Sequence, residues 1–196
     1  MVLKEEPKKN EAEQEFISLV TEPAIEMQWF EFASHQENAF KFSIDEQRQI
    51  LTGVALVPDM PIYRKMKMSE GEEAKEFYVV FEKQTVFDFV KKFMKNRYNK
   101  HINISHNNDD IVDDAFLFES LVVDESRGML APKMFEGVRD GSWVVSLQIE
   151  DKNSWERIKR EGLKGFSVQA MMGMEYVATE EEGLLQTIAD MTKGDS

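Results

Sequence analysis

Residues 164–170 read Lys-Gly-Phe-Ser-Val-Gln-Ala, and this stretch predicts a β-strand that carries one serine. Its apolar residues Phe166, Val168 and Ala170 recur at every second position, which is the side-chain period of a strand. Ser167 is therefore expected on the opposite face of the strand. A serine hydroxyl is a weak nucleophile, so this residue becomes a catalytic candidate only if a base lies beside it.

The candidate base is His106, because histidine is the side chain that ordinarily titrates near neutral pH. It follows Asn103, Ile104 and Ser105 in a run that alternates like a strand. Ile102 and Ile104 would share a strand face with the imidazole, so we expect a partly buried ring. The serine and the histidine together predict nucleophilic catalysis by serine.

The serine segment differs from the nucleophile elbow of α/β-hydrolases. In that motif the serine stands between two glycines on a turn from a strand to a helix. Gly165 is present, but Gln169 stands where the second glycine belongs, and the expected helix precedes the strand. The nucleophile elbow of α/β-hydrolases is therefore excluded for this segment.

A histidine that acts as a base needs a third group to fix its orientation and tautomer. Glu119 is our candidate, because alternation places it on one strand face with Leu117 and Leu121. A carboxylate buried on that face would be costly unless it had a partner. Four aspartates in the expected loop are less suited to this orienting role: Asp109, Asp110, Asp113 and Asp114.

The run from His106 to Asp110 also offers oxygen and nitrogen ligands for a divalent ion. The spacing is not that of an EF-hand, and no second histidine stands at helical spacing to complete a zinc site. We expect neither a metal nor another cofactor. A divalent-metal hydrolase that uses His106 with Asp109 and Asp110 remains an alternative.

Composition narrows the class of protein further. The 196 residues contain no cysteine, which excludes a cysteine protease and disulfides. The formal net charge of −13 would repel phosphate backbones, so we expect no nucleic-acid partner. No apolar run approaches the roughly 20 residues that a membrane span requires, so we expect no membrane partner either.

The periodicity predicts more strands than helices. Strands are expected over residues 16–20, 29–32, 40–44, 50–57, 77–81, 101–106, 115–124, 143–149 and 164–177. Helices are expected over residues 86–94 with Thr85 as N-cap, over a segment opened by Asn153 and Glu156 and ended by Gly162, and over residues 184–191. Residues 64–76 and 107–114 are expected to be loops.

Most expected strands are joined by connections too short for parallel crossovers. The predicted fold class is therefore α+β, a mostly antiparallel curled sheet or β-barrel with a few surrounding helices. Residues 1–15 are expected to be a disordered charged tail, residues 16–178 one folded domain, and residues 179–196 an acidic tail or short helix.

Eight segments, taken in order, resemble the XkdF-like serine proteases of phages and phage-derived elements, which are relatives of prohead maturation proteases. The segments are FISLVTEPAI (16–25), KFSID (41–45), GVALVPDMPIYR (53–64), FYVVF (77–81), NISHN (103–107), FESL (118–121), GSWVVS (141–146) and KGFSV (164–168). The resemblance runs from about residue 16 to about residue 178.

The resemblance implies a fold similar to the herpesvirus assemblin protease and the role of a serine endopeptidase in phage capsid maturation. Such an enzyme would lie inside the immature capsid, the prohead, in the host cytoplasm. It would cleave the scaffold protein and the N-terminal region of the major capsid protein, and enzymes of this kind often cleave themselves. Residues 16–178 would then be the protease domain.

The same resemblance carries over the roles of nucleophile and base to Ser167 and His106. Assemblins use a second histidine beyond the serine, and no histidine follows His106 in this chain. A carboxylate, for which Glu119 is the candidate, would replace it, or the site would work as a dyad. A backbone N–H would suffice as the oxyanion donor. The alternative is a catalytically silent capsid-assembly or scaffold-binding protein with the same fold. The sequence leaves open whether the chain forms a homo-oligomer.

Overall fold

The computed structural model describes residues 2–3, 15–21, 41, 43–66, 75–169 and 174–175. Its α-helices in that part of the chain are α1 (Lys83–Lys95) and α2 (Lys152–Arg160). The strands are β1 (Val2–Leu3), β2 (Phe16–Val20), β3 (Ser43–Asp45), β4 (Ile50–Leu56), β5 (Ile62–Met66), β6 (Lys75–Phe81), β7 (Ile102–Ile104), β8 (Asn107–Ile111), β9 (Ala115–Val122), β10 (Trp143–Ile149), β11 (Gly165–Gln169) and β12 (Met174–Glu175). These elements confirm the α+β class.

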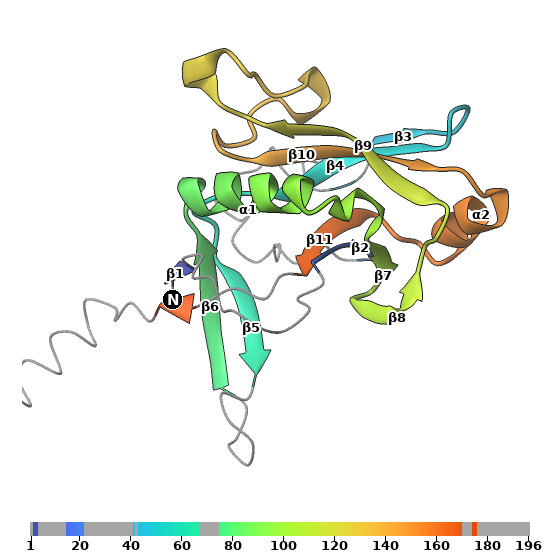
Figure 1. Cartoon of the computed structure of the whole chain (residues 1–196), viewed down its shortest axis with the longest axis horizontal. Coiled ribbons are helices and arrows are strands. Elements are labelled where there is room, and N and C mark those ends of the chain that lie inside the picture. The colour runs from blue at the N-terminus through green and yellow to red at the C-terminus, as the bar shows by residue number, and fades with distance from the viewer. Residues whose placement is uncertain are drawn as a thin grey trace, which may run out of the picture.

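The described strands form three four-stranded sheets with the orders β12-β1-β6-β5, β3-β4-β10-β9 and β11-β2-β7-β8. Neighbouring strands are antiparallel except for β1 with β6 and β2 with β7, so the prediction of a mostly antiparallel architecture is confirmed. The prediction of a closed barrel is wrong over the described residues, because none of the three sheets closes on itself. Figure 1 shows α1 running beside β10, with the β5-β6 hairpin extending away from them.

The main core lies between α1 and the two sheets that contain β10 and β2. Phe89 and Phe93 of α1 are almost fully buried, and both pack edge-on against Trp143 of β10, with ring centroids 5.8 and 5.4 Å apart. Phe166 and Val168 of β11 enter the same cluster of buried side chains, as their alternation predicts. The helix aromatics are therefore packing residues.

Both helices form where the periodicity predicts them, but their N-termini differ from the expectation. Helix α1 begins two residues before Thr85, after Glu82, and Thr85 is a buried residue of the helix and not its N-cap. The N-cap of α2 is Asp151, whose carboxylate accepts a hydrogen bond from the Ser154 backbone N–H at 2.6 Å. An aspartate is as good a cap as the expected asparagine, and it stands two residues earlier.

Two segments expected as loops contain strands instead. Residues 64–66 and 75–76 belong to the antiparallel pair β5-β6, and residues 107–111 form β8. Both segments contain charged side chains, and β8 also contains asparagines. Strands can hold such residues because backbone pairing does not require an apolar face on each strand. Val2–Leu3, which falls within the expected disordered tail, forms β1 between β6 and β12.

Other expectations meet the structure only in part. Residues 29–32 and 184–191 lie outside the described residues, as do Phe40 and Phe42. Ile44 lies on β3, but its side chain is exposed and not on a buried face. The expected strand 164–177 is described as β11 and β12 only.

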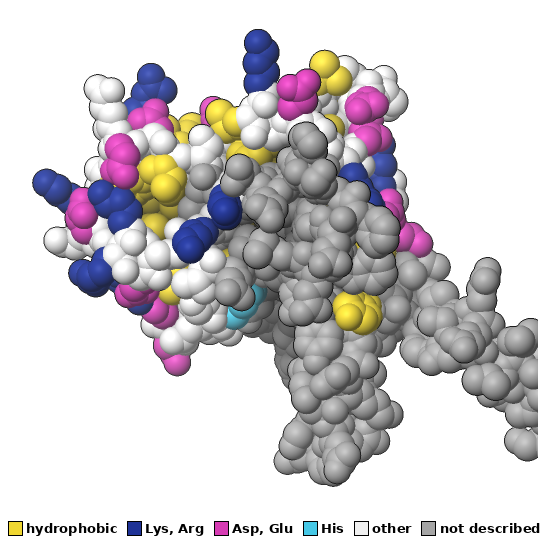
Figure 2. All heavy atoms as spheres, turned by 180° about the vertical axis from the view of Figure 1, so that it is seen from behind, with side chains coloured by type: hydrophobic (Ala, Val, Ile, Leu, Met, Phe, Trp, Pro, Cys, Tyr) yellow, Lys and Arg dark blue, Asp and Glu magenta, His cyan; other side chains and the backbone are white. Residues whose placement is uncertain are grey.

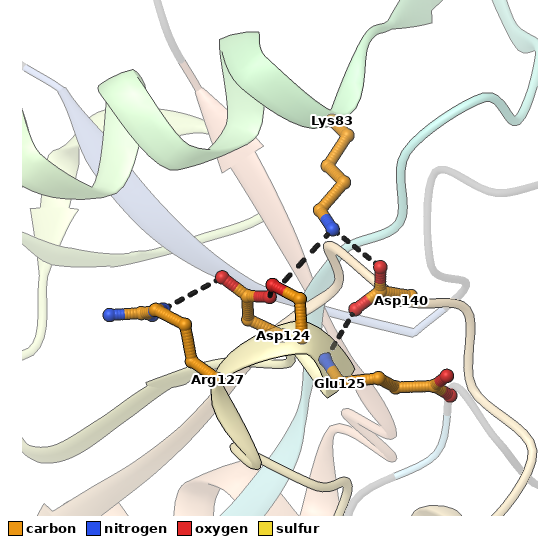
Figure 3. Close-up of polar contacts among 6 residues, drawn as sticks. Lys83, Asp124, Glu125, Arg127 and Asp140 are labelled. Carbon is orange, nitrogen blue, oxygen red and sulfur yellow. Dashed lines mark hydrogen bonds and ion pairs between the residues drawn. The ribbon is translucent and has the colours of Figure 1, made fainter.

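A group of charged side chains connects the start of α1 to the segment after β9 (Figure 3). Lys83 forms an ion pair with Asp140 and lies 4.0 Å from Asp124. Asp140 also accepts a hydrogen bond from the Glu125 backbone N–H at 2.9 Å, and Asp124 accepts one from Arg127 Nε at 2.7 Å. A lysine at a helix N-terminus is unfavourable by itself, and these carboxylates offset it.

This group makes stability depend on pH. Hydrogen bonds from Ser126 and then from Arg127 lower the pKa of Asp124 from 3.8 to about 2. A carboxyl whose folded pKa is depressed stabilises the fold above its unfolded pKa, and that contribution is lost as the pH falls between about 4 and 2. We expect Asp124→Asn to flatten this acid limb of the free energy of unfolding, measured by urea denaturation at each pH. An unchanged slope would contradict the assignment, and Glu136→Gln, which removes an exposed carboxylate of the same segment, is the control.

On the face drawn in Figure 2, basic and acidic side chains of the described residues are interspersed. The net charge of −13 is therefore not gathered there into one acidic patch. Among the described helices none is long and apolar enough to cross a bilayer.

Candidate active site

Three polar residues lie side by side on adjacent strands of the sheet β11-β2-β7-β8. Ser18 of the central strand β2 is in register with Ser167 of antiparallel β11 and with Asn103 of parallel β7. Residues opposite one another on neighbouring strands point to the same face and have Cβ atoms about 5 Å apart. All three are almost fully buried, with at most 2 % of any of them exposed.

Hydrogen bonds join this row of residues to the imidazole. The Ser18 hydroxyl donates to Asn103 Oδ1 at 2.6 Å, and Ser18 Oγ lies 2.9 Å from His106 Nδ1. Ser167, the predicted nucleophile, is thus the strand neighbour of the residue that contacts the predicted base. The structure therefore places Ser167 and His106 in one sheet, each beside Ser18, although the sequence separates them widely.

His106 is not positioned by a strand face, contrary to expectation. Strand β7 ends at Ile104, and Ser105 and His106 form the two-residue turn of the β7-β8 hairpin, with φ of 51° and 59°. Positive φ at both central residues is the requirement of type I′ turns, which match the twist of the strands they connect. The imidazole is therefore exposed and leans back over β2, while Ile102 and Ile104 are buried in the core.

Contacts at both ends hold this hairpin in place. The Ser105 backbone N–H donates to the Leu19 carbonyl of β2 at 2.9 Å. Asp110 of β8 accepts two hydrogen bonds from the Arg157 guanidinium of α2, at 2.7 and 2.6 Å. The hydrogen bonds from the same guanidinium lower the pKa of Asp110. The turn that carries His106 is thereby fixed to both β2 and α2.

Ser167 Oγ differs from the other hydroxyls of this group. It is buried and has no hydrogen-bond partner among the described residues. Unsatisfied buried polar atoms are rare in proteins and are often associated with function. The hydroxyl proton of Ser167 is therefore not committed to another acceptor in the described part of the protein.

Glu119 lies in another sheet, and the prediction that it shares a strand face with Leu117 is wrong, whereas it does share one with the partly buried Leu121. The β9-β10 register pairs Leu147 with Leu117 but Ser146 with Glu119, so β9 carries a β-bulge at Phe118. A bulge inserts one residue and reverses the face of those that follow. Glu119 is consequently exposed on the side opposite to Leu117, where its carboxylate accepts a hydrogen bond from Ser146 Oγ at 2.5 Å. Its orienting role stays a prediction, since no contact between described residues joins it to His106.

The alternative metal site gains no further ligands. Among the described residues no three His, Cys, Asp or Glu side chains gather as a metal would require. Asp110, one of its proposed ligands, is engaged by Arg157. Residues 125–140 border a surface hollow of about 500 Å³, but its lining includes neither Ser167 nor His106.

Residues 37–175 match the model of a family described as "Putative phage serine protease XkdF", and the chain belongs to this family. Ser167, His106 and Asn103 lie inside the matched range, and Ser18 precedes it. No curated protein and no solved structure matches the chain.

The sequence-based prediction did not include Ser18 and Asn103, which the structure places beside Ser167 or His106. A signal was present for both, because each is a single polar residue between apolar neighbours of a short strand: Ser18 between Ile17 and Leu19, and Asn103 between Ile102 and Ile104. A polar side chain in a strand that is buried on both faces needs a partner. The sequence does not show that they are each other's partner, since this depends on the parallel register of β2 and β7.

Proposed function

We propose that this phage protease is the serine endopeptidase of capsid maturation, with Ser167 as nucleophile and His106 as general base. It cleaves the scaffold protein and the N-terminal region of the major capsid protein inside the prohead, in the host cytoplasm. One observation carries the proposal: a buried serine without a hydrogen-bond partner stands in register beside the residue whose Oγ is 2.9 Å from His106 Nδ1. A relationship to herpesvirus assemblin belongs to the same proposal.

The reaction follows from these roles. Ser167 Oγ forms a bond to the peptide carbonyl carbon as its proton passes to His106. The imidazolium then gives this proton to the leaving amine as the C–N bond breaks, which leaves an acyl-enzyme. Water attacks the ester, His106 accepts a proton from it, and the acid product leaves as Ser167 recovers its proton. No oxidant, metal or other co-reactant is needed.

A second candidate function is favoured by the burial of Ser167. Only 2 % of this residue is exposed, so a peptide reaches it only after the atoms above it move. A catalytically silent capsid-assembly or scaffold-binding protein would tolerate such burial permanently. The two candidates differ in one property, which is the reactivity of the Ser167 hydroxyl.

A serine-directed fluorophosphonate measures this reactivity. The full chain is incubated with the probe and digested, and the labelled peptide is identified by mass spectrometry. We expect a single adduct on the peptide that contains Ser167, formed as the Oγ–P bond replaces the P–F bond and fluoride leaves. Co-expression with scaffold and major capsid protein should give defined fragments of both, and mapping of the chain's own fragments tests self-cleavage.

Matched variants define the outcomes. Ser142 is a second buried serine whose Oγ has no partner among the described residues, so Ser142→Ala removes an equivalent hydroxyl. This variant should be labelled and should cleave as the unaltered chain does. If Ser167 is not labelled while the scaffold still binds and stays whole, the silent assembly protein is the correct reading. Cleavage that is abolished by a chelator would instead indicate the metal hydrolase.

A further inference from the structure

We propose that Ser18 is a positioning residue of the active site, which fixes the tautomer of His106 by holding its Nδ1–H. The inference rests on the proposed serine peptidase function and extends it to a strand that precedes the range matched by the family model. It assigns to a hydroxyl and an amide the task that a carboxylate performs in a Ser–His–Asp triad.

The protons of the Ser18 hydroxyl determine the direction of its two hydrogen bonds. A serine hydroxyl has one proton to donate and two lone pairs that accept. The Ser18 hydroxyl donates its proton to Asn103 Oδ1 at 2.6 Å, and a carbonyl oxygen can only accept. The contact of 2.9 Å between Ser18 Oγ and His106 Nδ1 must then be a bond in which Nδ1 is the donor.

This direction has a consequence for the other ring nitrogen. In a neutral imidazole one nitrogen carries the proton and the other has the lone pair. With the proton on Nδ1, the lone pair is on Nε2, which is the arrangement a general base needs if Nε2 faces the nucleophile. When His106 takes up the proton from Ser167, Ser18 Oγ continues to accept from Nδ1–H, so the contact also stabilises the imidazolium.

The direction of these two hydrogen bonds also argues against Ser18 as the nucleophile. Its proton is directed to Asn103, so in this arrangement Ser18 has no proton to pass to the imidazole. Ser167 Oγ, its neighbour across β2 and β11, has no such acceptor among the described residues. The two serines therefore have different roles, although they lie side by side on neighbouring strands.

The test uses the full chain with substitutions at Ser18 and Asn103. Ser18→Ala removes the acceptor of Nδ1–H, and Ser18→Thr retains it. Asn103→Leu leaves Ser18 Oγ in place but frees its proton, which can then be donated to Nδ1 and drive the ring to the Nε2–H tautomer. Ser142→Ala, which removes a buried hydroxyl from the residue before β10, controls for packing, and thermal unfolding of each variant verifies that it is folded.

Two measurements are made on each variant. The first is the rate of Ser167 labelling by the fluorophosphonate. The second is the ¹⁵N–¹H correlation spectrum of the imidazoles at a pH where His106 is neutral, with its signals identified by their loss in His106→Gln. The spectrum reports the tautomer, which a purely structural role of Ser18 would not change.

We expect Ser18→Ala and Asn103→Leu to slow labelling by at least about tenfold. The effect should be smaller than the roughly 10⁴-fold loss of rate that the wrong histidine tautomer causes in a Ser–His–Asp triad. Both should move the His106 proton from Nδ1 to Nε2, and Ser18→Thr should restore the rate and the spectrum. An unchanged rate and spectrum in Ser18→Ala overturns the inference and leaves the proposed function standing. A phosphonate adduct on Ser18 overturns it as well. A chain without reactivity at Ser167 refutes the proposed function instead, and the tautomer spectrum then decides the role of Ser18 independently.

Discussion

We expect Ser167→Ala to lower the rate of the proposed scaffold cleavage by a factor on the order of 10⁶, which is the effect of losing the nucleophile of a serine protease. The loss is complete in practice because no other hydroxyl occupies the same register position beside Ser18. The measurement is the rate of appearance of scaffold fragments from purified protein. A residual rate within tenfold of the unaltered chain would show that Ser167 is not the nucleophile.

The fold of this variant should be intact or slightly more stable. Ser167 Oγ is buried and makes no hydrogen bond with the described residues, so alanine removes an unsatisfied polar atom and no interaction. We expect the melting temperature to be unchanged or raised in Ser167→Ala and equally in Ser142→Ala, although only the former loses activity. The double variant Ser167→Ala/His106→Ala should cleave no more slowly than Ser167→Ala alone, because the two groups act as one unit.

Trp143→Ala destabilises the protein by roughly 3–5 kcal/mol, the largest loss that we expect from any single substitution in the described core. Trp143 is 0 % exposed and packs against Phe89 and Phe93, and its Nε1–H donates to Ser120 Oγ at 2.9 Å. Alanine leaves a large cavity and removes the partner of that hydroxyl. Since proteins are stable by only about 5–15 kcal/mol, a large part of the total would be lost.

Urea denaturation measures this difference, with two controls. Trp143→Phe keeps most of the ring volume and should cost clearly less than the alanine variant. Leu130→Ala removes an apolar side chain that is 67 % exposed, and it should change the free energy of unfolding by less than about 0.5 kcal/mol. A loss below about 1 kcal/mol in Trp143→Ala would contradict the central place of this tryptophan in the core.

Periodicity predicted the elements whose local pattern is strong. The apolar spacing of residues 86–94 correctly predicted α1. The strand predicted over residues 143–149 is β10, with the same bounds in the structure. The alternation around Ser167 placed Phe166 and Val168 in the core. These predictions succeed because burial of one face is decided within a few residues of sequence.

Other features depend on contacts that a local pattern does not contain. The strand face on which Glu119 lies is set by the β-bulge at Phe118. The alternation of apolar and polar residues does not predict such a bulge. The exposure of His106 is set by a two-residue turn without the Asn-Gly pair that usually marks one. Ser18 joins the site because β2 runs parallel to β7, a pairing between distant segments.

The position of β2 between β11 and β7 has a consequence for the order of folding. Ser18 contacts residues 85 and 88 positions later in the sequence, and its other neighbour, Ser167, is farther still. Contacts of such separation form late, because closing a long loop costs entropy before any contact is gained. During synthesis the serine and histidine segments therefore meet only after β11 has emerged. Under the proposed function, we therefore expect the nascent chain to have no proteolytic activity until β11 has paired with β2.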